Sequence, residues 1–441
     1  MSDLLAARSQ MAMSLGFHII FAVIGVAMPL MMTIAEWRWV RTGDPAYLAL
    51  ARRWAKGAAI LFAVGAVSGT VLSFELGLLW PRFMDWAGAI IGPLFALEGF
   101  AFFTEAIFLG IYLYGWHHLR PTLHIAAGII VTTSGVVSAA VVTTANAWMN
   151  TPAGFELADG LPRDIRPWAV MTNPHALHES LHMVLAAFAA TGLLVAGIHA
   201  FLILRGAHDN FHRYALAIAL LVGGIPTLLQ PISGDALTKV VAAHQPAKLA
   251  AMEALFHTAP GAAFHLGGLP DEESESVPYS LEIPKLLSLL LYLDPQATVA
   301  GLDRTPRRDW PPVAVVHVAF QIMVGAGMVM MMLVLWAAWR WKQGRLYEDR
   351  LLLWALALGA PLGFLAIEAG WVVTEVGRQP WIIYGIMRTS EAVTPMPGIA
   401  IPFVMFTVLY GVLALVVVWT ISRHISATER HGHPPESGEV R

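Results

Sequence analysis

The sequence contains no cysteine in 441 residues. Without thiols the chain cannot form disulfides, bind iron-sulfur clusters, ligate haem through a thiolate or attach c-type haem covalently. Any metal must therefore be held by histidine, methionine or carboxylate side chains. Charge is also scarce, because 13% of the residues are charged and the net charge is −3, which gives no basis for binding nucleic acid.

Apolar residues are abundant instead, at 57% of the chain, with a mean hydropathy of +0.63. This composition predicts an integral membrane protein rather than two or three soluble domains. The N-terminus has no short apolar core followed by a small-residue cleavage site, and the first long apolar run begins near Met11. We therefore expect that run to be retained as a membrane span.

Nine segments are apolar for long enough to cross roughly 30 Å of hydrocarbon. They lie at 12–35, 54–79, 92–116, 124–148, 175–204, 213–232, 312–339, 350–374 and 397–422. The sequence thus predicts an all-α polytopic bundle of nine transmembrane helices, six in residues 1–232 and three in 312–424. The loop at 233–311, which has repeated prolines and an acidic run, is expected to be folded and functional.

Basic residues are concentrated in alternate connections. Arg52, Arg53 and Lys56 follow the first span, whereas Arg340 and Arg345 follow the seventh. Positively charged connections remain on the cytoplasmic side of a membrane. We therefore expect the N-terminus and the long loop outside the cytoplasm, and the C-terminus with its polar tail at 425–441 inside.

Histidine and methionine within apolar spans are candidate iron ligands. His18 lies in the first span, where its imidazole either packs through a hydrogen bond or ligates haem iron. His178 and His182 are one turn apart at the start of the fifth span; either can ligate iron, and Glu179 can orient one of them. Met323 in the seventh span falls at a similar depth to His182, as two axial ligands of a low-spin haem would, although packing is the competing interpretation.

Carboxylates in or at the ends of spans are costly unless they are protonated, paired or hydrated. Glu98 and Glu105 are seven residues apart on one face of the third span, as in a proton relay or as polar contacts between helices. Glu375 and Arg378 close the eighth span, either as a snorkelling anchor or as a functional pair. We expect Glu98, His18 and Glu375 to lie level with one another near the outer face.

The long loop contains a short amphipathic stretch near 246–256. It places Lys248 and Glu253 about a turn and a half apart. Such a pair either faces water on a surface helix or hydrogen-bonds and deprotonates a quinol headgroup at the membrane surface.

Five stretches follow one another along the chain: Ala96–Gly99, Ala145–Met149, Gln245–Glu253, Gln321–Gly325, and Glu375 with Gly377–Trp381. In that order they resemble subunit I of cytochrome bd quinol oxidase, over the nine spans and most of the loops. Gln321 departs from the resemblance, because well-known members carry Arg at that position. The resemblance implies a terminal oxidase of the bacterial cytoplasmic (inner) membrane that oxidises quinol near the outer face and reduces O2 to water without pumping protons.

The resemblance further implies three haems near the outer face: one low-spin haem b, one high-spin haem b and one haem d. His182 and Met323 correspond to the axial ligands of the low-spin haem. His18 and Glu375 correspond to single ligands of the two high-spin haems, and which serves which stays open. Trp371 is expected beside these cofactors.

Substrate and proton roles follow from the same resemblance. Lys248 and Glu253 correspond to the quinol contacts. Glu98 and Glu105 correspond to a path for cytoplasmic protons, and Arg378 offsets haem propionates or the charge that accumulates on reduction. The implied partners are subunit II, small single-helix subunits, ubiquinol or menaquinol, O2 and the lipid bilayer.

Two other functions compete with the oxidase. One is a di-haem membrane cytochrome b that passes electrons between quinone and a partner without reducing O2. It would need paired histidines on facing helices, whereas this chain offers the carboxylate Glu375. The other is a haem-free proton-coupled transporter that uses Glu98, Glu105 and Glu375.

Overall fold

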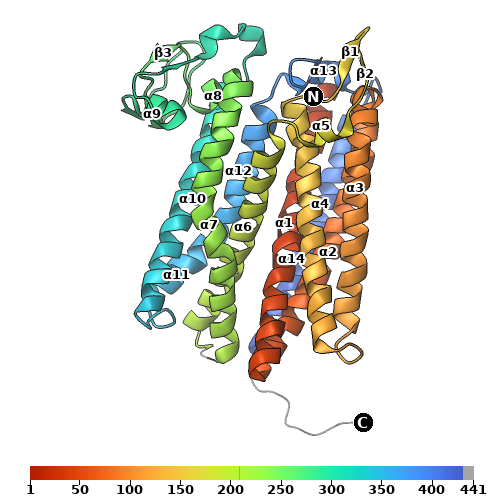
Figure 1. The fold of residues 1–441 in the computed structure, drawn as a ribbon, viewed down its shortest axis with the longest axis vertical. Coiled ribbons are helices and arrows are strands. Elements are labelled where there is room, and N and C mark those ends of the chain that lie inside the picture. Colours follow the sequence, from red (N-terminus) through yellow and green to blue (C-terminus); the bar gives the residue numbers. More distant parts are fainter. Residues whose placement is uncertain (208, 431–441) are drawn as a thin grey trace.

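The computed structural model describes residues 1–207 and 209–430 (Figure 1). In this part of the chain nine helical spans are long and apolar enough to cross a membrane, which confirms the predicted number. Their orientation across a membrane stays a prediction. They are α1 (Asp3–Thr42), α2 (Pro45–Leu79), α3 (Pro81–Tyr114), α4 (Pro121–Asn150), α6 (Ala176–Leu204), α7 (Asn210–His244), α10 (Val313–Lys342), α11 (Arg350–Gly359) together with α12 (Leu362–Val376), and α14 (Ala400–Arg430).

Helix starts follow local chemistry rather than hydropathy. Pro45, Pro81 and Pro121 stand in the first turn of α2, α3 and α4, where a helix needs no hydrogen-bond donor from the proline nitrogen. Asp44 caps α2 by accepting a hydrogen bond from the backbone N–H of Ala46 at 2.9 Å. These three helices begin before the apolar segments from which they were predicted, so each helix starts earlier than expected.

Besides these earlier starts, three further features of the predicted organisation differ from the structure. Helix α7 continues to His244, past the predicted end at 232, so the long connection begins at 245. The eighth span is broken at Pro361 into α11 and α12, because proline supplies no N–H to the helix ladder. Helix α14 runs to Arg430, so the predicted tail at 425–441 begins inside a helix, and its residues from 431 onward lie outside the described residues.

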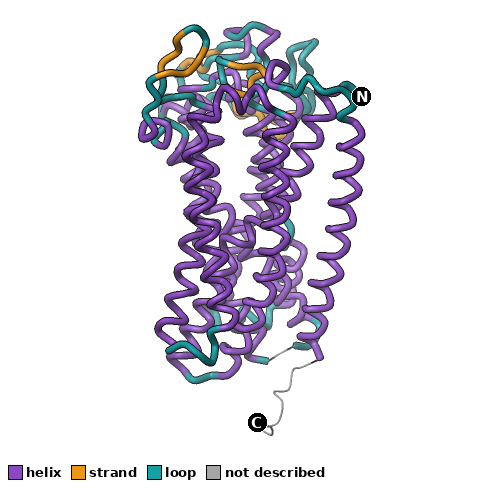
Figure 2. The backbone as a smooth tube through the Cα atoms, turned by 90° about the vertical axis from the view of Figure 1, so that its right-hand side faces the viewer, coloured by secondary structure: helices purple, strands orange, loops and turns teal. Residues whose placement is uncertain are grey.

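The remaining elements gather at one end of the bundle, which we call the capped end. Figure 1 shows α8, α9, β3, the β1–β2 hairpin, α13 and the N-terminus there, and Figure 2 agrees from the side. The strands pair antiparallel as β1–β2, β3–β6, β4–β5 and β7–β8. The elements are β1 (Glu156–Ala158), β2 (Leu161–Arg163), α5 (Pro167–Met171), α8 (Pro246–Met252), β3 (Ala259–Pro260), β4 (Phe264–Gly267), β5 (Ser280–Ile283), α9 (Leu286–Tyr292), β6 (Thr298–Val299), the 3-10 turns η1 (Leu302–Arg304) and η2 (Arg307–Asp309), β7 (Trp381–Ile383), β8 (Met387–Arg388) and α13 (Thr389–Ala392).

Helices α1 and α6 form the centre of the bundle. In their most apolar windows 61% and 72% of the residues are buried, against 11% for both α2 and α14, which present most of their surface outward. Close packing at the centre depends on small residues: a side chain at Gly192 of α6 would lie 2.4 Å from the Cα of Gly223 in α7. The central helices carry His18 and His182, so both imidazoles are held inside the bundle.

Candidate functional site

Glu375 and Arg378 lie at the end of α12, at the capped end. An Nη2 donor of Arg378 lies 2.6 Å from Oε2 of Glu375, and Nδ2 of Asn146 in α4 donates to Oε1 at 2.5 Å. The Arg378 side chain is 2% exposed. A snorkelling anchor would hold its guanidinium in water, so that interpretation is wrong. The pair, with Arg378 buried and Glu375 at 30% exposure, joins α12 to α4.

Lys248 and Glu253 are both buried, at 4% and 2% exposure, so the interpretation of α8 as a solvated surface helix is wrong. Nζ of Lys248 donates to Oδ1 of Asn150 at 2.6 Å. Gln245 supports this contact, because its amide donates to the backbone carbonyl of Asn150 at 3.1 Å. The start of the long connection is therefore tied to the end of α4.

Burial changes the acid-base behaviour of this pair. Loss of hydration, with Arg378 as a further cause, lowers the pKa of Lys248 to about 7. Burial raises the pKa of Glu253 to about 8, and its Oε2 has no hydrogen-bond partner in the described part of the chain. Both groups can therefore exchange protons close to neutral pH.

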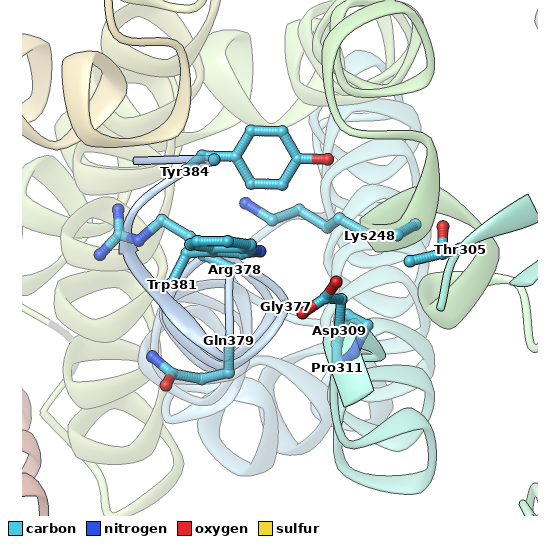
Figure 3. A pocket seen from close by; sticks show the side chains of 11 residues that line it. Lys248, Thr305, Asp309, Pro311, Gly377, Arg378, Gln379, Trp381 and Tyr384 are labelled. Atoms are coloured by element: carbon cyan, nitrogen blue, oxygen red, sulfur yellow. The ribbon is translucent and has the colours of Figure 1, made fainter. Parts of the chain in front are cut away.

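A cavity of about 190 Å³ opens at Lys248. Its lining combines aromatic, basic and acidic side chains, and Figure 3 shows Lys248 extending toward Tyr384 and Trp381, with Asp309 on the facing wall. Arg378 also lines it, whereas Glu253 does not. The structure thus brings Lys248 and Arg378 to one cavity and leaves Glu253 in the packed interior of the loop.

His18 has a fixed hydrogen-bonding arrangement. Its Nδ1 lies 3.0 Å from Oγ of Ser68 in α2, and that hydroxyl donates its own proton to the backbone carbonyls of Val64 or Gly65 at 2.9 and 3.1 Å. The serine must therefore accept from Nδ1–H, which leaves Nε2 with a free lone pair. A Cβ at Gly69 would lie 3.0 Å from Cε1 of His18, so the absent side chain leaves room beside the ring.

His182 repeats this arrangement on α7. Its Nδ1 lies 2.9 Å from Oγ of Ser233, whose hydroxyl donates to the carbonyl of Gln230 at 3.0 Å. The Gln230 amide nitrogen lies 3.3 Å from Nε2, as expected when Nε2 carries the lone pair. A Cβ at Gly234 would lie 3.3 Å from Cε1 of His182. His178 has no such partner, because its buried Nδ1 is unpaired within the described residues.

Met323 and Trp371 border the same region from α10 and α12. A Cβ at Gly370 would lie 3.0 Å from the sulfur of Met323, so this candidate ligand also faces a glycine. Nε1 of Trp371 is buried without a partner in the described part of the chain. Met323 faces α12, whereas His182 faces α7, so their pairing as two ligands of one haem stays a prediction.

Glu98 and Glu105 both face α4, as predicted from their spacing. Ser138 donates to Oε1 of Glu98 at 3.1 Å, and a Cβ at Gly135 would lie 3.4 Å from the carboxyl oxygens of Glu105. Ser138 precedes Asn146 by eight residues, about 12 Å along the helix axis. Because Asn146 contacts Glu375, the expectation that Glu98 and Glu375 lie level is wrong, and Glu98 is deeper in the bundle.

Gln321 occupies the position where the resemblance predicted Arg. Its amide donates to the carbonyl of His265 at 2.8 Å, and its oxygen accepts from the N–H of Gly267 at 3.1 Å. The residue therefore binds the backbone of β4 and fastens the long connection to α10. A glutamine amide can donate one of these bonds and accept the other, whereas an arginine could only donate.

Sequence reasoning missed several polar residues. Asn150, Ser68 and Ser233 gave no signal because their partners lie far away in the sequence. Glu368 could have been found, since it precedes Glu375 by seven residues on the same helix face; its buried Oε1 is unpaired within the described residues. Glu75 was also missed, and its Oε1 accepts from Gln10 and Ser14, each at 2.9 Å.

The unpaired donors fit an anionic cofactor. Nε and Nη1 of Arg378, Nε1 of Trp371 and Nδ1 of His178 are all buried without partners in the described residues. Buried donors are rarely left unpaired in a functional state. Together with the imidazoles of His18 and His182, whose Nδ1 atoms lie beside serine hydroxyls, and with the glycines beside their rings, these donors suit iron ligation and propionate binding by haem.

Comparisons with known proteins agree with this donor set. The chain matches the family "Cytochrome bd terminal oxidase subunit I" over residues 6–429. It is 38% identical to the putative cytochrome bd menaquinol oxidase subunit I of Bacillus subtilis (96% of each chain) and 27% identical to the cytochrome bd-II ubiquinol oxidase subunit 1 of Escherichia coli (95% of each).

A solved structure shares the fold. The chain is similar to the bd oxidase from Geobacillus thermodenitrificans with a TM-score of 0.91 and 38% identity, covering 97% of this chain and 99% of that one. The family match and this likeness both extend over nearly the full length. The chain therefore belongs to the cytochrome bd terminal oxidase subunit I family and is a multi-pass membrane subunit of a quinol oxidase.

Proposed function

We propose that this chain oxidises quinol at the Lys248 cavity and holds the haems at which O2 is reduced to water. The observation that carries the proposal is the shared geometry of His18 and His182: Nδ1 of each lies within 3.0 Å of a serine hydroxyl, and a glycine leaves room beside Cε1 of each ring. That geometry is what iron ligation requires. The competing di-haem electron carrier and haem-free transporter lose support, because the family is one of terminal oxidases.

The proposed ligand assignments follow from the family resemblance. His182 and Met323 would hold a low-spin haem b, and His18 and Glu375 would each hold one of the two high-spin haems, one b-type and one d-type. When bound, these groups carry the electrons and bind O2. Arg378 keeps Glu375 in its anionic form through their 2.6 Å contact and has two further donors for a propionate.

Quinol oxidation is proposed to take place where Lys248 enters the cavity. Tyr384 and Trp381 offer aromatic faces for a quinol ring, while Lys248 can bind a ring oxygen. With its pKa lowered to about 7, Lys248 can also take up a quinol proton near neutral pH. Glu253 would then act as a second acceptor behind the cavity. The substrate is ubiquinol or menaquinol.

Protons for water formation are proposed to come from the cytoplasm by way of Glu105 and Glu98. Both carboxyls face α4, and Glu98 is the one closer to Asn146 and Glu375. If quinol protons leave outside and substrate protons enter from inside, charge is separated without a pump. Subunit II and small single-helix subunits would complete the assembly in the bacterial inner membrane.

The decisive experiment is a reduced-minus-oxidised absorption spectrum of the purified complex, with extraction and identification of its haems. We expect two high-spin signals and one low-spin band, and CO binding to the reduced form. Glu375→Ala should remove one high-spin signal and keep the low-spin band. Glu75→Ala is the matched control, because it removes a membrane carboxyl elsewhere in the bundle. Absence of haem bands, absence of CO binding or an unchanged Glu375→Ala spectrum would each contradict the assignment.

A further inference from the structure

The last turn of α4 lies between the two functional regions. Asn146 and Asn150 are four residues apart and therefore on one face of the helix. Asn150 accepts a hydrogen bond from Lys248, and Asn146 donates one to Glu375. Nδ2 of Asn150 donates to Oδ1 of Asn146 at 3.1 Å, which connects these two hydrogen bonds. An unbroken line of side-chain hydrogen bonds thus runs from the long connection to the end of α12.

The bonds of this line can point in only one direction. The carboxylate of Glu375 can only accept, so Asn146 must present its NH2 group to it and its oxygen to Asn150. Asn150 must then present its own NH2 to Asn146 and its oxygen to Lys248. Every donor points toward Glu375, and hydrogen bonds aligned in this way polarise one another.

The line is shielded from water at its Lys248 end and partly exposed at Asn146 and Glu375. Asn150 is 1% exposed and Lys248 is 4% exposed. Gln245, which is fully buried, fixes Asn150 from the other side by donating to its backbone carbonyl and, at 3.3 Å, to its Oδ1. In a buried setting the electrostatic part of each bond is stronger than in water, so a change at one end is transmitted with less screening.

We propose that Asn146 and Asn150 form an amide bridge that couples occupancy of the quinol cavity to the Glu375 carboxylate. The proposal rests on the proposed function, in which Lys248 binds quinol and Glu375 is a haem ligand. A quinol oxygen that bonds Lys248 competes with Asn150 for its donors, which weakens the polarisation of the bridge and makes Oε1 of Glu375 more electron-rich. Both asparagines are positioning residues, since neither contacts the reacting atoms.

Coupling of this kind is reciprocal. The bound quinol analogue should shift the absorption band of the haem held by Glu375, and the redox state of that haem should change the affinity for the analogue. A purely structural contact between the loop and α4 predicts neither effect. The test therefore measures an optical shift and a pair of dissociation constants rather than turnover.

The experiment uses the whole purified complex and heptyl-hydroxyquinoline N-oxide as a non-oxidisable quinol analogue. In the unmodified protein we expect a band shift on binding and a difference of about fivefold or more between the Kd values of the oxidised and reduced forms. Asn150→Leu removes both the donor and the acceptor and should abolish the shift and equalise the two Kd values while the haem bands remain.

Asn150→Asp separates coupling from mere positioning of Lys248. Aspartate still accepts from Lys248 but can no longer donate to Asn146, so the shift should also be lost in this variant. If Asn150 only holds Lys248 in place, Asn150→Asp keeps the shift, and the bridge is wrong. If the Asn150→Leu complex fails to assemble, the Asn150→Asp complex still tests the proposal.

Asn173→Leu is the matched control, because Asn173 is a buried asparagine at the same end that bonds Thr151 and Val170 and lies off the bridge. It should keep the shift; an equal loss in this variant would overturn the proposal. A complex that contains no haem or does not bind the analogue would contradict the proposed function itself. A complex that binds and shifts normally in both Asn150 variants would contradict the bridge alone.

Discussion

Helix α4 carries two polar stretches of opposite character. At its capped end, Asn146 and Asn150 join a closed line of hydrogen bonds with a lysine at one end and an ion pair at the other. About 12–17 Å from Asn146 along the helix axis, Ser138 and Gly135 offer one hydroxyl and an empty position to the carboxyls of Glu98 and Glu105. The stretch at the capped end holds charges in fixed places, whereas we propose that the deeper stretch leaves its carboxyls room to gain and lose a proton.

The largest effect should come from breaking the ion pair of Glu375 and Arg378. Arg378→Leu leaves Glu375 without its cation. Because Arg378 is 2% exposed and Glu375 is 30% exposed, we expect a cost between the roughly 1 kcal/mol of an exposed pair and the about 3–5 kcal/mol of a fully buried one. We expect the thermal midpoint of the complex to fall and one high-spin haem band to disappear. Arg388→Leu is the matched control, because the Arg388 side chain, which pairs with Asp309, is 29% exposed, so its loss should cost less. Equal losses in both variants would mean that the burial of Arg378 does not strengthen its ion pair.

The deeper stretch is tested by Glu105→Gln. An amide keeps the shape of the carboxyl but cannot release a proton, and proton transfer by a positioned group contributes about a hundredfold or more to a rate. We expect O2 consumption with a quinol donor to fall by about that factor while haem content and melting temperature stay unchanged. Loss of haem instead of turnover would assign Glu105 to structure.

The sequence was sufficient for the number of spans because long apolar runs have few alternatives to membrane helices. It was misleading at the end of α7, where polar residues from Ser233 onward lowered the hydropathy although the helix continues. That error concealed the partner of His182, since Ser233 lies in the part predicted to be loop. Hydropathy reports transfer into lipid and does not report hydrogen bonding inside a bundle.

The candidate site was predictable one residue at a time but not as an arrangement. Glu375 and Arg378 are close in sequence, so helix geometry was enough to pair them. Lys248 and Asn150 are 98 residues apart, and their contact depends on how α8 docks against α4. The resemblance named Lys248 without naming its partner, because a motif records residue types and not the packing of elements.

Glu253 differs from Lys248 and Glu375 at the capped end, because it is a buried carboxyl whose Oε2 has no hydrogen-bond partner among the described residues. Burial raises its pKa from the ordinary 4.5 to about 8, so the folded protein binds its proton more tightly than the unfolded chain does. The resulting stability is fully present below about pH 4.5 and is lost as the pH rises to about 8. Glu253→Gln should remove this loss, which is on the order of a few kcal/mol.

Thermal melts of the complex at several pH values test this expectation. The Glu253→Gln variant should match the unmodified protein near pH 4.5 and melt several degrees higher at pH 8 and above. Glu272→Gln, in the same loop, is the control for replacing a loop carboxyl by an amide. A difference between the Glu253 variant and the unmodified protein that does not depend on pH would mean that Glu253 has a partner in the assembled complex.

The smallest effect should come from Ser138→Ala, which removes the hydroxyl that donates to Glu98. A single neutral donor contributes about 1 kcal/mol. Asn146→Leu on the same helix removes a 2.5 Å bond to a charged oxygen, and bonds to charged groups contribute roughly twice as much. Comparing the two variants by thermal melting and haem content measures the contrast along α4 directly. Similar losses would mean that Glu98 is held as a charged group too, in which case the deeper stretch is a structural contact between helices rather than part of a proton path.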